Sequence, residues 1–400
     1  MYMRSFLVFA IKIKLRIVKG VKVLYTLFTK DKESPRMKIT KITSYIYPEY
    51  LTHIVRVETD EGITGYGECS PMSVHVTAQI IHDNIAPKLI GLNPFDIETA
   101  EKYAMTNNYK IRGQLLAMSW SGIELALRDI QGKALGMPVY MLLGGRFRDE
   151  VEFYASSMDR SSPPEKVGED VARMVEEMGV SCCKIKVGGR IGSTKDIPDL
   201  ENDVAKVRAV REAIGPDCRL ILDCNSSYTV GQALLLWEKV APYDIYHFEE
   251  PCPYWDMRAY KTLAEKLPVP MNIGEQDWDL MVFREFLENR ACHIVAADPV
   301  KSGGLTNAKR VAALCRAYNV VYAPHNTSRA IGFAANMQLA ACTPEYSYYQ
   351  EFNIEPRPLQ EQFLTEQYKL TNGKFRVPEL PGLGAPLDVE KLERIAIQVG

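Results

Sequence analysis

Residues Arg219–Asn225 have the sequence RLILDCN, and this short apolar run with a polar end decides the fold. A comparable run precedes it at Cys182–Val187 (CCKIKV), and another follows it at Tyr246–Pro251 (YHFEEP). A helical pattern at Leu200–Ile214 separates the first two runs. Strands that alternate with helices indicate a parallel sheet. We therefore expect neighbouring parallel strands whose polar ends meet at one edge of the sheet.

The same alternation extends over residues 149–360 and predicts eight strands. They are Val151–Ser157, Cys182–Val187, Arg219–Asn225, Tyr246–Glu250, Met271–Glu275, Ile294–Pro299, Val320–Pro324 and Tyr348–Phe352. Eight strands with helices between most of them predict an α/β protein with a TIM-type barrel. The rival is a doubly wound sheet, but the GxGxxG motif that follows its first strand is missing.

The segments that flank the predicted barrel have other patterns. Residues 37–148 combine two β-rich runs with a helix at Ala117–Leu135, which predicts an α+β domain. Residues 361–400 are rich in Pro and Gly, and we expect them to pack back on that domain. Residues 1–36 carry nine Lys or Arg against two acidic residues, and we expect a basic extension outside the fold.

The composition excludes several classes of protein. With 46% hydrophobic and 24% charged residues, the 400-residue chain is neither disordered nor collagen-like. A net charge of −2 implies no general polyanion-binding surface, so we expect no nucleic-acid partner. No apolar run approaches the ~18 residues of a membrane helix. Nine scattered cysteines without a CxxC pair indicate reduced, buried thiols in a cytoplasmic protein.

Ionisable or amide side chains end seven consecutive predicted strands, starting with the second. In a barrel of this type, chemistry takes place at the C-terminal ends of the strands. A single carboxylate there is most often solvated or caps the next helix, but seven such strand ends together favour a functional site. The side chains are Lys184, Lys186, Asp223, Asn225, Glu249, Glu275, Asp298, His325 and Glu351.

Three of these carboxylates, Asp223, Glu249 and Glu275, come from successive strands. Converging carboxylates repel one another unless a cation lies between them. A ligand set made only of oxygen favours a hard ion, Mg²⁺ or the related Mn²⁺. The pattern predicts a metal site with coordination positions left for substrate and water.

The remaining rim residues suggest acid–base chemistry. Lys184 and Lys186 are two residues apart and point to the same side of their strand, and one of two adjacent ammonium groups near a dication is a plausible base. Asp298 and His325 end adjacent strands, where a carboxylate fixes the histidine tautomer. Strand alternation discounts Lys301 as a base and turns Glu250 away from the site. Alternation also turns His247 inward, and its role stays open.

These motifs together resemble the enolase superfamily, specifically its mandelate racemase-like subgroup, from Met37 onward. The motifs are KIK at Lys184–Lys186, DCN at Asp223–Asn225, FEEP at Phe248–Pro251, GE at Gly274–Glu275, KSGGLT at Lys301–Thr306, APHN at Ala323–Asn326 and EF at Glu351–Phe352.

The resemblance implies a capping domain over a modified (β/α)7β barrel. It also implies Mg²⁺ on Asp223, Glu249 and Glu275, with a Lys or His base beside the metal. The remaining roles follow from the same resemblance. Lys186 and the His325–Asp298 dyad would be bases on opposite faces of the substrate α-carbon, Lys184 and Glu351 would contact the enolate oxygens, and Asn225 would bind substrate.

Several activities are compatible with these residues. The leading hypothesis is dehydration of an acid sugar to a 2-keto-3-deoxy acid by a homo-oligomeric enzyme. The alternatives are a racemase or epimerase of a 2-hydroxy acid and a sugar-acid lactone cycloisomerase. A non-catalytic binding relative would have lost a ligand or a base, and none is lost. The connection between the first two strands, Tyr47–Leu51, is very short. The resemblance to the family therefore does not tell which substrate this chain uses.

Overall fold

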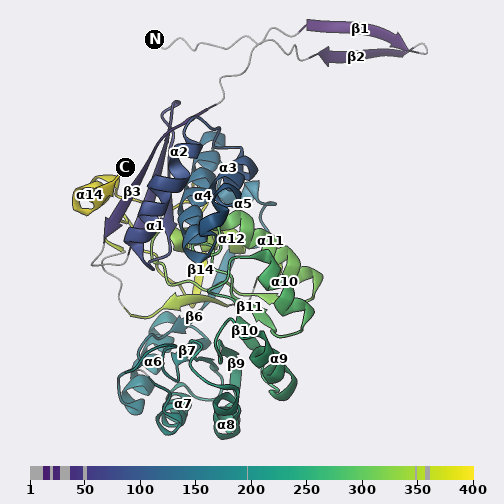
Figure 1. Ribbon diagram of the computed structural model, residues 1–400. Coiled ribbons are helices and arrows are strands. Elements are labelled where there is room, and N and C mark those ends of the chain that lie inside the picture. The colour runs from purple at the N-terminus through teal and green to yellow at the C-terminus, as the bar shows by residue number, and fades with distance from the viewer. Residues whose placement is uncertain are drawn as a thin grey trace. The chain divides into compact units, whose positions relative to one another are not determined.

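The computed structural model describes residues 12–18, 21–27, 37–47, 52–195, 197–346, 349–355 and 361–400. The chain divides into two units, Met1–Met37 and Lys38–Gly400. In the first unit, β1 (Lys12–Val18) pairs antiparallel with β2 (Val21–Leu27), which the sequence patterns did not predict (Figure 1). The second unit holds all the predicted site residues. The exact boundaries assigned to the domains within it stay predictions.

Eight parallel strands form the barrel in chain order, with the last strand beside the first. Their bounds are β6 (Glu150–Ser156), β7 (Cys182–Lys186), β8 (Arg219–Asp223), β9 (Ile245–Glu249), β10 (Met271–Ile273), β11 (Ile294–Val295), β12 (Val321–Tyr322) and β13 (Tyr349–Asn353). Strand β13 pairs parallel with β6, and a bridge between Tyr322 and Tyr346 joins β12 to the segment before β13. The predicted α/β class and the (β/α)7β barrel are confirmed.

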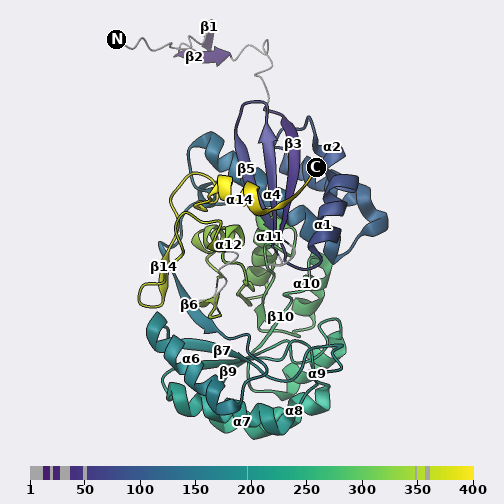
Figure 2. The same cartoon turned by 90° about the vertical axis from the view of Figure 1, so that its left-hand side faces the viewer.

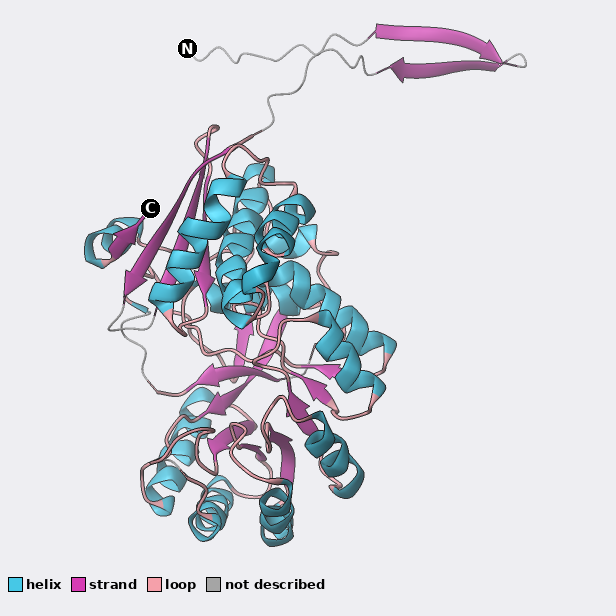
Figure 3. Ribbon diagram, viewed as in Figure 1, coloured by secondary structure: helices cyan, strands magenta, loops and turns pink. Residues whose placement is uncertain are grey.

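Seven helices connect these strands and cover the barrel from outside (Figure 3). They are α6 (Pro164–Met178), α7 (Leu200–Ile214), α8 (Val230–Val240), α9 (Met257–Lys266), α10 (Leu280–Glu288), α11 (Gly304–Ala317) and α12 (Ile331–Ala341). Local sequence explains where several of them begin. Asp199, Thr229, Asp256 and Asp279 each accept a hydrogen bond from a backbone N–H of the first turn of α7, α8, α9 and α10.

An antiparallel sheet and several helices form the capping domain (Figure 2). The sheet order is β15 (Ile397–Val399), β3 (Ile39–Tyr47), β4 (Thr52–Thr59) and β5 (Thr64–Cys69), so the chain end pairs with the cap. The helical segments of the cap are α1 (Val74–Ile80), η2 (Ile81–Ile85), α2 (Ala86–Leu89), α3 (Ile97–Ala104), η3 (Thr106–Ile111), α4 (Gln114–Leu135) and α5 (Val139–Leu142). Strand β14 (Lys374–Arg376) pairs with β6, and α14 (Val389–Ile395) precedes β15. Strand β5 was missed because its glycines hide the β pattern.

Those glycines are needed because β5 lies directly against the long buried helix α4. A Cβ on Gly67 would come within 1.9 Å of the Gly122 carbonyl oxygen, and one on Gly65 within 2.1 Å of the Ala126 carbonyl oxygen. Only glycine allows this approach of two backbones. Helix α4 ends as predicted at Gly136, whose φ of 66° lies in the left-handed region.

Three barrel strands are shorter than predicted. Strands β10, β11 and β12 stop after two or three residues, whereas the patterns extended them to Glu275, Pro299 and Pro324. Gly274 has a φ of 96°, which turns the chain out of the sheet, and proline cannot donate to a ladder. The polar residues at these ends therefore lie on loops.

Two further expectations concern cysteine and membranes. All nine cysteines are buried and have free thiols, as the sequence predicted. Among the helices of the described residues, none has the length and hydropathy needed to span a bilayer.

Candidate active site

The three predicted metal ligands lie together at the C-terminal ends of adjacent strands. Asp223 and Glu249 are the last residues of β8 and β9 and are register partners. Glu275 follows β10 by two residues and is only 4% exposed, while the other two are still less exposed. The ends of β8, β9 and β10 thus form an arc of three buried carboxylates.

Backbone strain is concentrated directly after this arc. Asn225 and Ser226 follow β8 with φ values of 40° and 62°, and Glu250 follows β9 with a φ of 39°. Non-glycine residues rarely adopt the left-handed region, and functional sites often store such strain. The strain turns the chain sharply where the carboxylates leave their strands.

Lys184 connects the arc to the last barrel strand. Its Nζ lies 2.8 Å from Glu249 Oε1, 2.8 Å from Glu351 Oε1 and 3.3 Å from Asp223 Oδ2, and its side chain is fully buried. Burial alone lowers the pKa of a lysine, but the carboxylates of Glu249 and Glu351 outweigh it and raise the pKa of Lys184 well above its usual value. Lys184 is therefore a permanent positive charge in this arrangement and not a base.

Lys186 points to the same side of β7 as Lys184, as predicted, and donates to Asp223 Oδ2. Burial works against the charged form of Asp223, but the two lysines outweigh it and lower the pKa of Asp223 below its usual range. For Glu249 the balance is opposite, since burial and the Asp223 carboxylate raise its pKa. The positive charge of the two lysines thus favours the ionised form of Asp223 but is too small to do the same for the adjacent Glu249.

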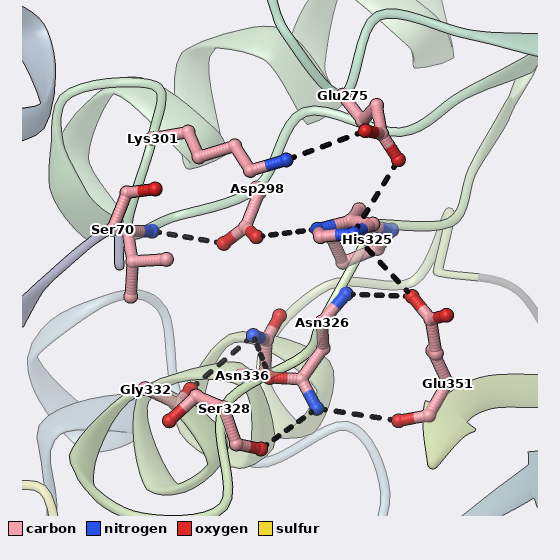
Figure 4. Close-up of polar contacts among 12 residues, drawn as sticks. Ser70, Glu275, Asp298, Lys301, His325, Asn326, Ser328, Gly332, Asn336 and Glu351 are labelled. Atoms are coloured by element: carbon pink, nitrogen blue, oxygen red, sulfur yellow. Dashed lines mark hydrogen bonds and ion pairs between the residues drawn. The ribbon is translucent and has the colours of Figure 1, made fainter. Parts of the chain in front are cut away.

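The predicted dyad forms on the other side of the arc (Figure 4). His325 Nδ1 lies 2.7 Å from Asp298 Oδ2, and His325 Nε2 lies 3.4 Å from Glu275 Oε2. Val300 N donates to the other oxygen of Asp298 at 2.9 Å. The carboxylate accepts from Nδ1–H, which leaves Nε2 to face the centre of the site.

Glu351 closes the ring between the lysines and the dyad. Ser156 Oγ donates to Glu351 Oε1 at 2.7 Å, and Asn326 N donates to Glu351 Oε2 at 3.0 Å. Burial raises the pKa of this carboxyl, but Lys184 and His325 outweigh it and lower the pKa to about 2. Glu351 is therefore an anion that accepts hydrogen bonds from its neighbours.

Asn225 lies at the edge of the site and is oriented by a residue that the sequence patterns did not indicate. Arg160, in the loop after β6, donates from one guanidinium nitrogen to Asn225 Oδ1 and from another to the Gly189 carbonyl at 2.9 Å. Asn225 N also donates to Asp223 Oδ1 at 3.0 Å. The predicted substrate-binding amide is thus tied to the first predicted metal ligand.

Strand alternation gave the wrong direction for two side chains, whereas the expectation that Lys301 is not a base stays a prediction. Lys301 is only 2% exposed, and its Nζ lies 3.4 Å from Glu275 Oε1. Glu250 is also buried, and besides burial the neighbouring Glu275 and Asp223 raise its pKa. Alternation failed because β11 ends at Val295 and β9 at Glu249, so both residues lie on loops. Both belong to the charged cluster.

His247, whose role the sequence left open, points into the barrel below the arc. It is 5% exposed, and within the described residues neither ring nitrogen has a hydrogen-bond partner. Burial lowers the pKa of His247 to about 3, so the ring is neutral. It lines a cavity of about 230 Å³ with Tyr154, Asn272 and Tyr246. This cavity is separate from the rim.

The donor set suits a hard divalent cation in chemistry and in charge. Six buried carboxylates face three lysines and one histidine; the carboxylates are Asp223, Glu249, Glu250, Glu275, Asp298 and Glu351. Burial first, and then the neighbouring carboxylates, raise the pKa of both Glu249 and Glu250, so added positive charge at this place would favour their ionised forms. Among residues with a described placement, no three His, Cys, Asp or Glu side chains are already arranged to hold a metal ion. Lys184 and Lys186 contact two of the carboxylates instead, and these contacts would have to open for Mg²⁺ to bind.

The two candidate bases approach this arc from its two ends. Lys186 lies on β7, directly before the arc strands, whereas His325 follows β12, two strands beyond them. A carboxylate substrate bound over the arc would therefore have a lysine on one side and a histidine on the other. This arrangement can remove or return a proton on either side of one carbon atom.

Two family models match the chain. The model described as "Mandelate racemase / muconate lactonizing enzyme, N-terminal domain" matches residues 34–144. The model described as "Enolase C-terminal domain-like" matches residues 166–392. Together they span both the capping domain and the barrel.

Individual proteins with known names are similar over most of the chain. D-xylonate dehydratase of Haloferax volcanii is 32% identical over 362 residues, which cover 88% of this chain and 87% of that protein. D-galactarolactone cycloisomerase of Agrobacterium fabrum is 32% identical over 354 residues, covering 85% and 89%. A crystal structure named mandelate racemase/muconate lactonizing protein, from Paracoccus denitrificans, has a TM-score of 0.84 at 28% identity, covering 91% of this chain and 99% of that one.

Proposed function

Because the chain belongs to the enolase superfamily, in its mandelate racemase/muconate lactonizing enzyme group, we propose that it removes the proton α to a carboxylate in a Mg²⁺-dependent reaction. The proposed reaction is the dehydration of an acid sugar to a 2-keto-3-deoxy acid. The observation that carries this proposal is the placement of Lys186 and the His325–Asp298 dyad at the two ends of the carboxylate arc. The similarity to D-xylonate dehydratase supports an acid sugar as substrate.

In the proposed reaction, Asp223, Glu249 and Glu275 would hold the metal. Bound Mg²⁺ would supply positive charge that binds the substrate carboxylate and stabilises the enediolate. Lys184 adds a fixed positive charge on one side of that centre. Glu351 is an anion here, so it can contact an enolate oxygen only after it takes up a proton, because two anions repel one another.

Lys186 and His325 would carry the proton transfers. One base accepts the α-proton, and the electron pair of the broken C–H bond forms the new C=C bond. Protonated His325 donates from Nε2 to the β-hydroxyl, the C–O bond breaks and water leaves. The resulting enol then tautomerises to the 2-keto acid. Asp298 holds the imidazole in the tautomer that this step needs.

A second candidate is cycloisomerisation of a sugar-acid lactone. D-galactarolactone cycloisomerase and D-xylonate dehydratase are both 32% identical to this chain. This equal identity favours cycloisomerisation as the second candidate. A racemase or epimerase would use the same two bases and is the third alternative. A homo-oligomeric assembly and a cytoplasmic location stay predictions.

The deciding experiment is a panel of acid sugars and their lactones, incubated with the protein and Mg²⁺ or with EDTA. We expect ¹H NMR to show a 2-keto-3-deoxy product from at least one acid sugar with Mg²⁺ and none with EDTA. Isomerisation of a lactone without loss of water would support the second candidate. Turnover that survives EDTA would contradict the metal-dependent mechanism.

A further inference from the structure

The end of cap strand β5 contacts both barrel loops that carry the dyad. Ser70 N donates to the Val300 carbonyl at 3.1 Å, and Val300 N in turn donates to Asp298 Oδ1 at 2.9 Å. The residue two positions earlier, Glu68, reaches the other loop, which follows His325. The cap therefore contacts the dyad loops by backbone on one side and by side chain on the other.

Glu68 binds that second loop through both of its carboxylate oxygens. Ser328 Oγ lies 2.9 Å from Oε1 and 2.8 Å from Oε2, and Gly332 N donates to Oε2 at 2.7 Å. Glu68 is 2% exposed and Ser328 is 5% exposed. Burying a carboxyl group costs free energy unless it is hydrogen-bonded, so Glu68 needs these contacts in its buried position.

The hydrogen bond from Gly332 N to Glu68 also takes the place of a side-chain cap at the start of α12. This 11-residue helix follows Ala330 and has no side-chain cap of its own, so its first N–H groups lack a partner within the helix. An oxygen that accepts from one of these N–H groups stabilises the start of the helix. Glu68 supplies that oxygen from the other domain, which makes the start of α12 dependent on the cap.

The loop between β12 and α12 has attachments besides Glu68, including Arg329, which pairs with Glu361 at 3.3 Å and lies over the Phe352 ring. Strand β12 pairs with β11 over two residues only, and His325 N donates to the Ala296 carbonyl at 3.1 Å. Beyond His325, Asn326 Nδ2 donates to the Glu351 carbonyl at 3.2 Å, and Asn336 Nδ2 donates to Asn326 Oδ1 at 3.2 Å. Glu68 adds the attachment of this loop that comes from the cap.

We infer that Glu68 is a positioning residue: from the cap, it holds the loop Ser328–Gly332 so that His325 faces Asp298 at hydrogen-bond distance. The cap then does more than cover the site, because it sets the geometry of one of the two bases. Lys186 is on β7, and within the described residues no hydrogen bond or ion pair joins it to this loop. This inference rests on the proposed function for its effect on proton transfer, although its geometric part does not.

The test compares Glu68→Ala with Glu68→Gln and with Asp129→Asn as a matched control. Asp129 is another buried cap carboxylate that accepts from backbone N–H groups, those of Tyr66 and Leu383, away from the dyad loops. Each acid sugar has a single α-proton, so the two C2 epimers are used, one for each face. Exchange of that proton in D₂O is followed by ¹H NMR with Mg²⁺ and reports the face on which each epimer carries it. Lys186→Ala and His325→Asn identify which base serves which face.

We expect Glu68→Ala to slow exchange on the His325 face by about 10- to 100-fold and to leave the Lys186 face nearly unchanged, because small misplacements of a reacting group have effects of this size. Glu68→Gln keeps one acceptor oxygen for Gly332 and should recover most of the loss. Asp129→Asn should lower Tm without preference for either face. Equal slowing of both faces by Glu68→Ala, or no slowing, would overturn the inference.

A second measurement needs no substrate. A strong His–Asp hydrogen bond places the Nδ1 proton at low field in the ¹H NMR spectrum, and His325→Asn identifies that signal. It should move or disappear in Glu68→Ala and stay in Asp129→Asn. If the wild type does not exchange the α-proton of either C2 epimer of any acid sugar, the proposed function fails, and this signal alone decides the inference. An unchanged signal in Glu68→Ala would refute it.

Discussion

The guanidinium of Arg160 donates a hydrogen bond to the side-chain oxygen of Asn225. Arginine has five N–H donors and no acceptor, so this contact determines which end of the amide faces it. Asn225 must turn Oδ1 toward Arg160, so Nδ2 remains as its side-chain donor. We therefore expect a substrate group that binds Asn225 through Nδ2 to be a hydrogen-bond acceptor.

Asn225→Asp tests this orientation. The aspartate keeps a partner for Arg160 but removes the Nδ2 donor, so kcat/KM for the acid-sugar substrate should fall by about 10- to 100-fold, the loss expected for one strong hydrogen bond. Asn93→Asp is the control, since Asn93 lies on the surface and uses only Oδ1, as the acceptor for Phe95 N. Equal kcat/KM values in Asn225→Asp and wild type would contradict the assignment of Asn225.

Loss of any one arc carboxylate should weaken Mg²⁺ binding. Asp223→Asn, Glu249→Gln and Glu275→Gln each remove charge from a shell that has three protein oxygens, and calorimetric titration with Mg²⁺ measures the effect. Asp203→Asn is the control, because Asp203 is a buried carboxylate that accepts from Gly188 N and Tyr228 outside the arc. Wild-type Mg²⁺ affinity in all three arc variants would refute the metal site.

The two bases should act on opposite faces of the α-carbon. In D₂O, Lys186→Ala should abolish exchange on one face and His325→Asn on the other, each by about 10²–10⁴-fold. Both variants should lose dehydration if one base takes the α-proton and the other protonates the leaving hydroxyl. One variant that retains turnover would indicate that a single residue performs both steps. Full activity in both variants would refute the mechanism.

Lys301→Met should destabilise the protein more without metal than with it. The methionine removes the ammonium group beside Glu275, which keeps contacts with Gln276 Nε2 and with His325 Nε2 at 3.4 Å. Breaking a buried ion pair completely typically costs about 3–5 kcal/mol, so we expect a smaller loss here. Bound Mg²⁺ would restore positive charge at Glu275. The fall in Tm should therefore be larger in EDTA than in excess Mg²⁺. Lys206→Met is the comparison, since Lys206 is buried but donates to the Arg160 carbonyl outside the arc. Equal effects of Mg²⁺ on both variants would contradict this prediction.

The free energy of unfolding should depend on pH through Glu68. Burial raises the pKa of Glu68 from 4.5 to about 7, so the folded state holds a proton that the unfolded state releases between these values. The contribution of this carboxyl to stability therefore falls as the pH rises through that range, by up to roughly 3 kcal/mol. Glutamine does not titrate. The Tm of Glu68→Gln relative to wild type should thus increase from about pH 5 to pH 8, and a constant difference would be inconsistent with the raised pKa.

The residues found from sequence and those missed differ in a physical way. Asp223 and Glu249 end regular strands, where the two-residue alternation determines the direction of each side chain. Lys301 and Glu250 follow strands that have already ended, and their direction depends on turns with unusual backbone angles. Extending the alternation past the last ladder hydrogen bond therefore placed both residues incorrectly.

The cap contributes to the site through residues that no sequence pattern indicated. Glu68 and Ser70 end a strand that went unpredicted because Gly65 and Gly67 lack β-forming side chains. Ser328 and Gly332, the partners of Glu68, lie 260 or more positions away in the chain, and Ser70 contacts the distant Val300. No local rule connects positions so far apart, and contact between them exists only after the cap has packed on the barrel.

The sequence by itself determined the α/β barrel, the capping domain, the three arc carboxylates, both lysines and the dyad. Each of these depends on short-range periodicity, because parallel strands separated by helices must present their C-terminal ends at one rim. Only the tertiary structure decided which charges touch: Lys184 bridges Glu249 and Glu351, Lys301 faces Glu275, Arg160 orients Asn225, and Glu68 holds the loop after His325. Those contacts depend on loop turns and on the packing of two domains, and both are set by the burial of side chains that lie far apart in the sequence.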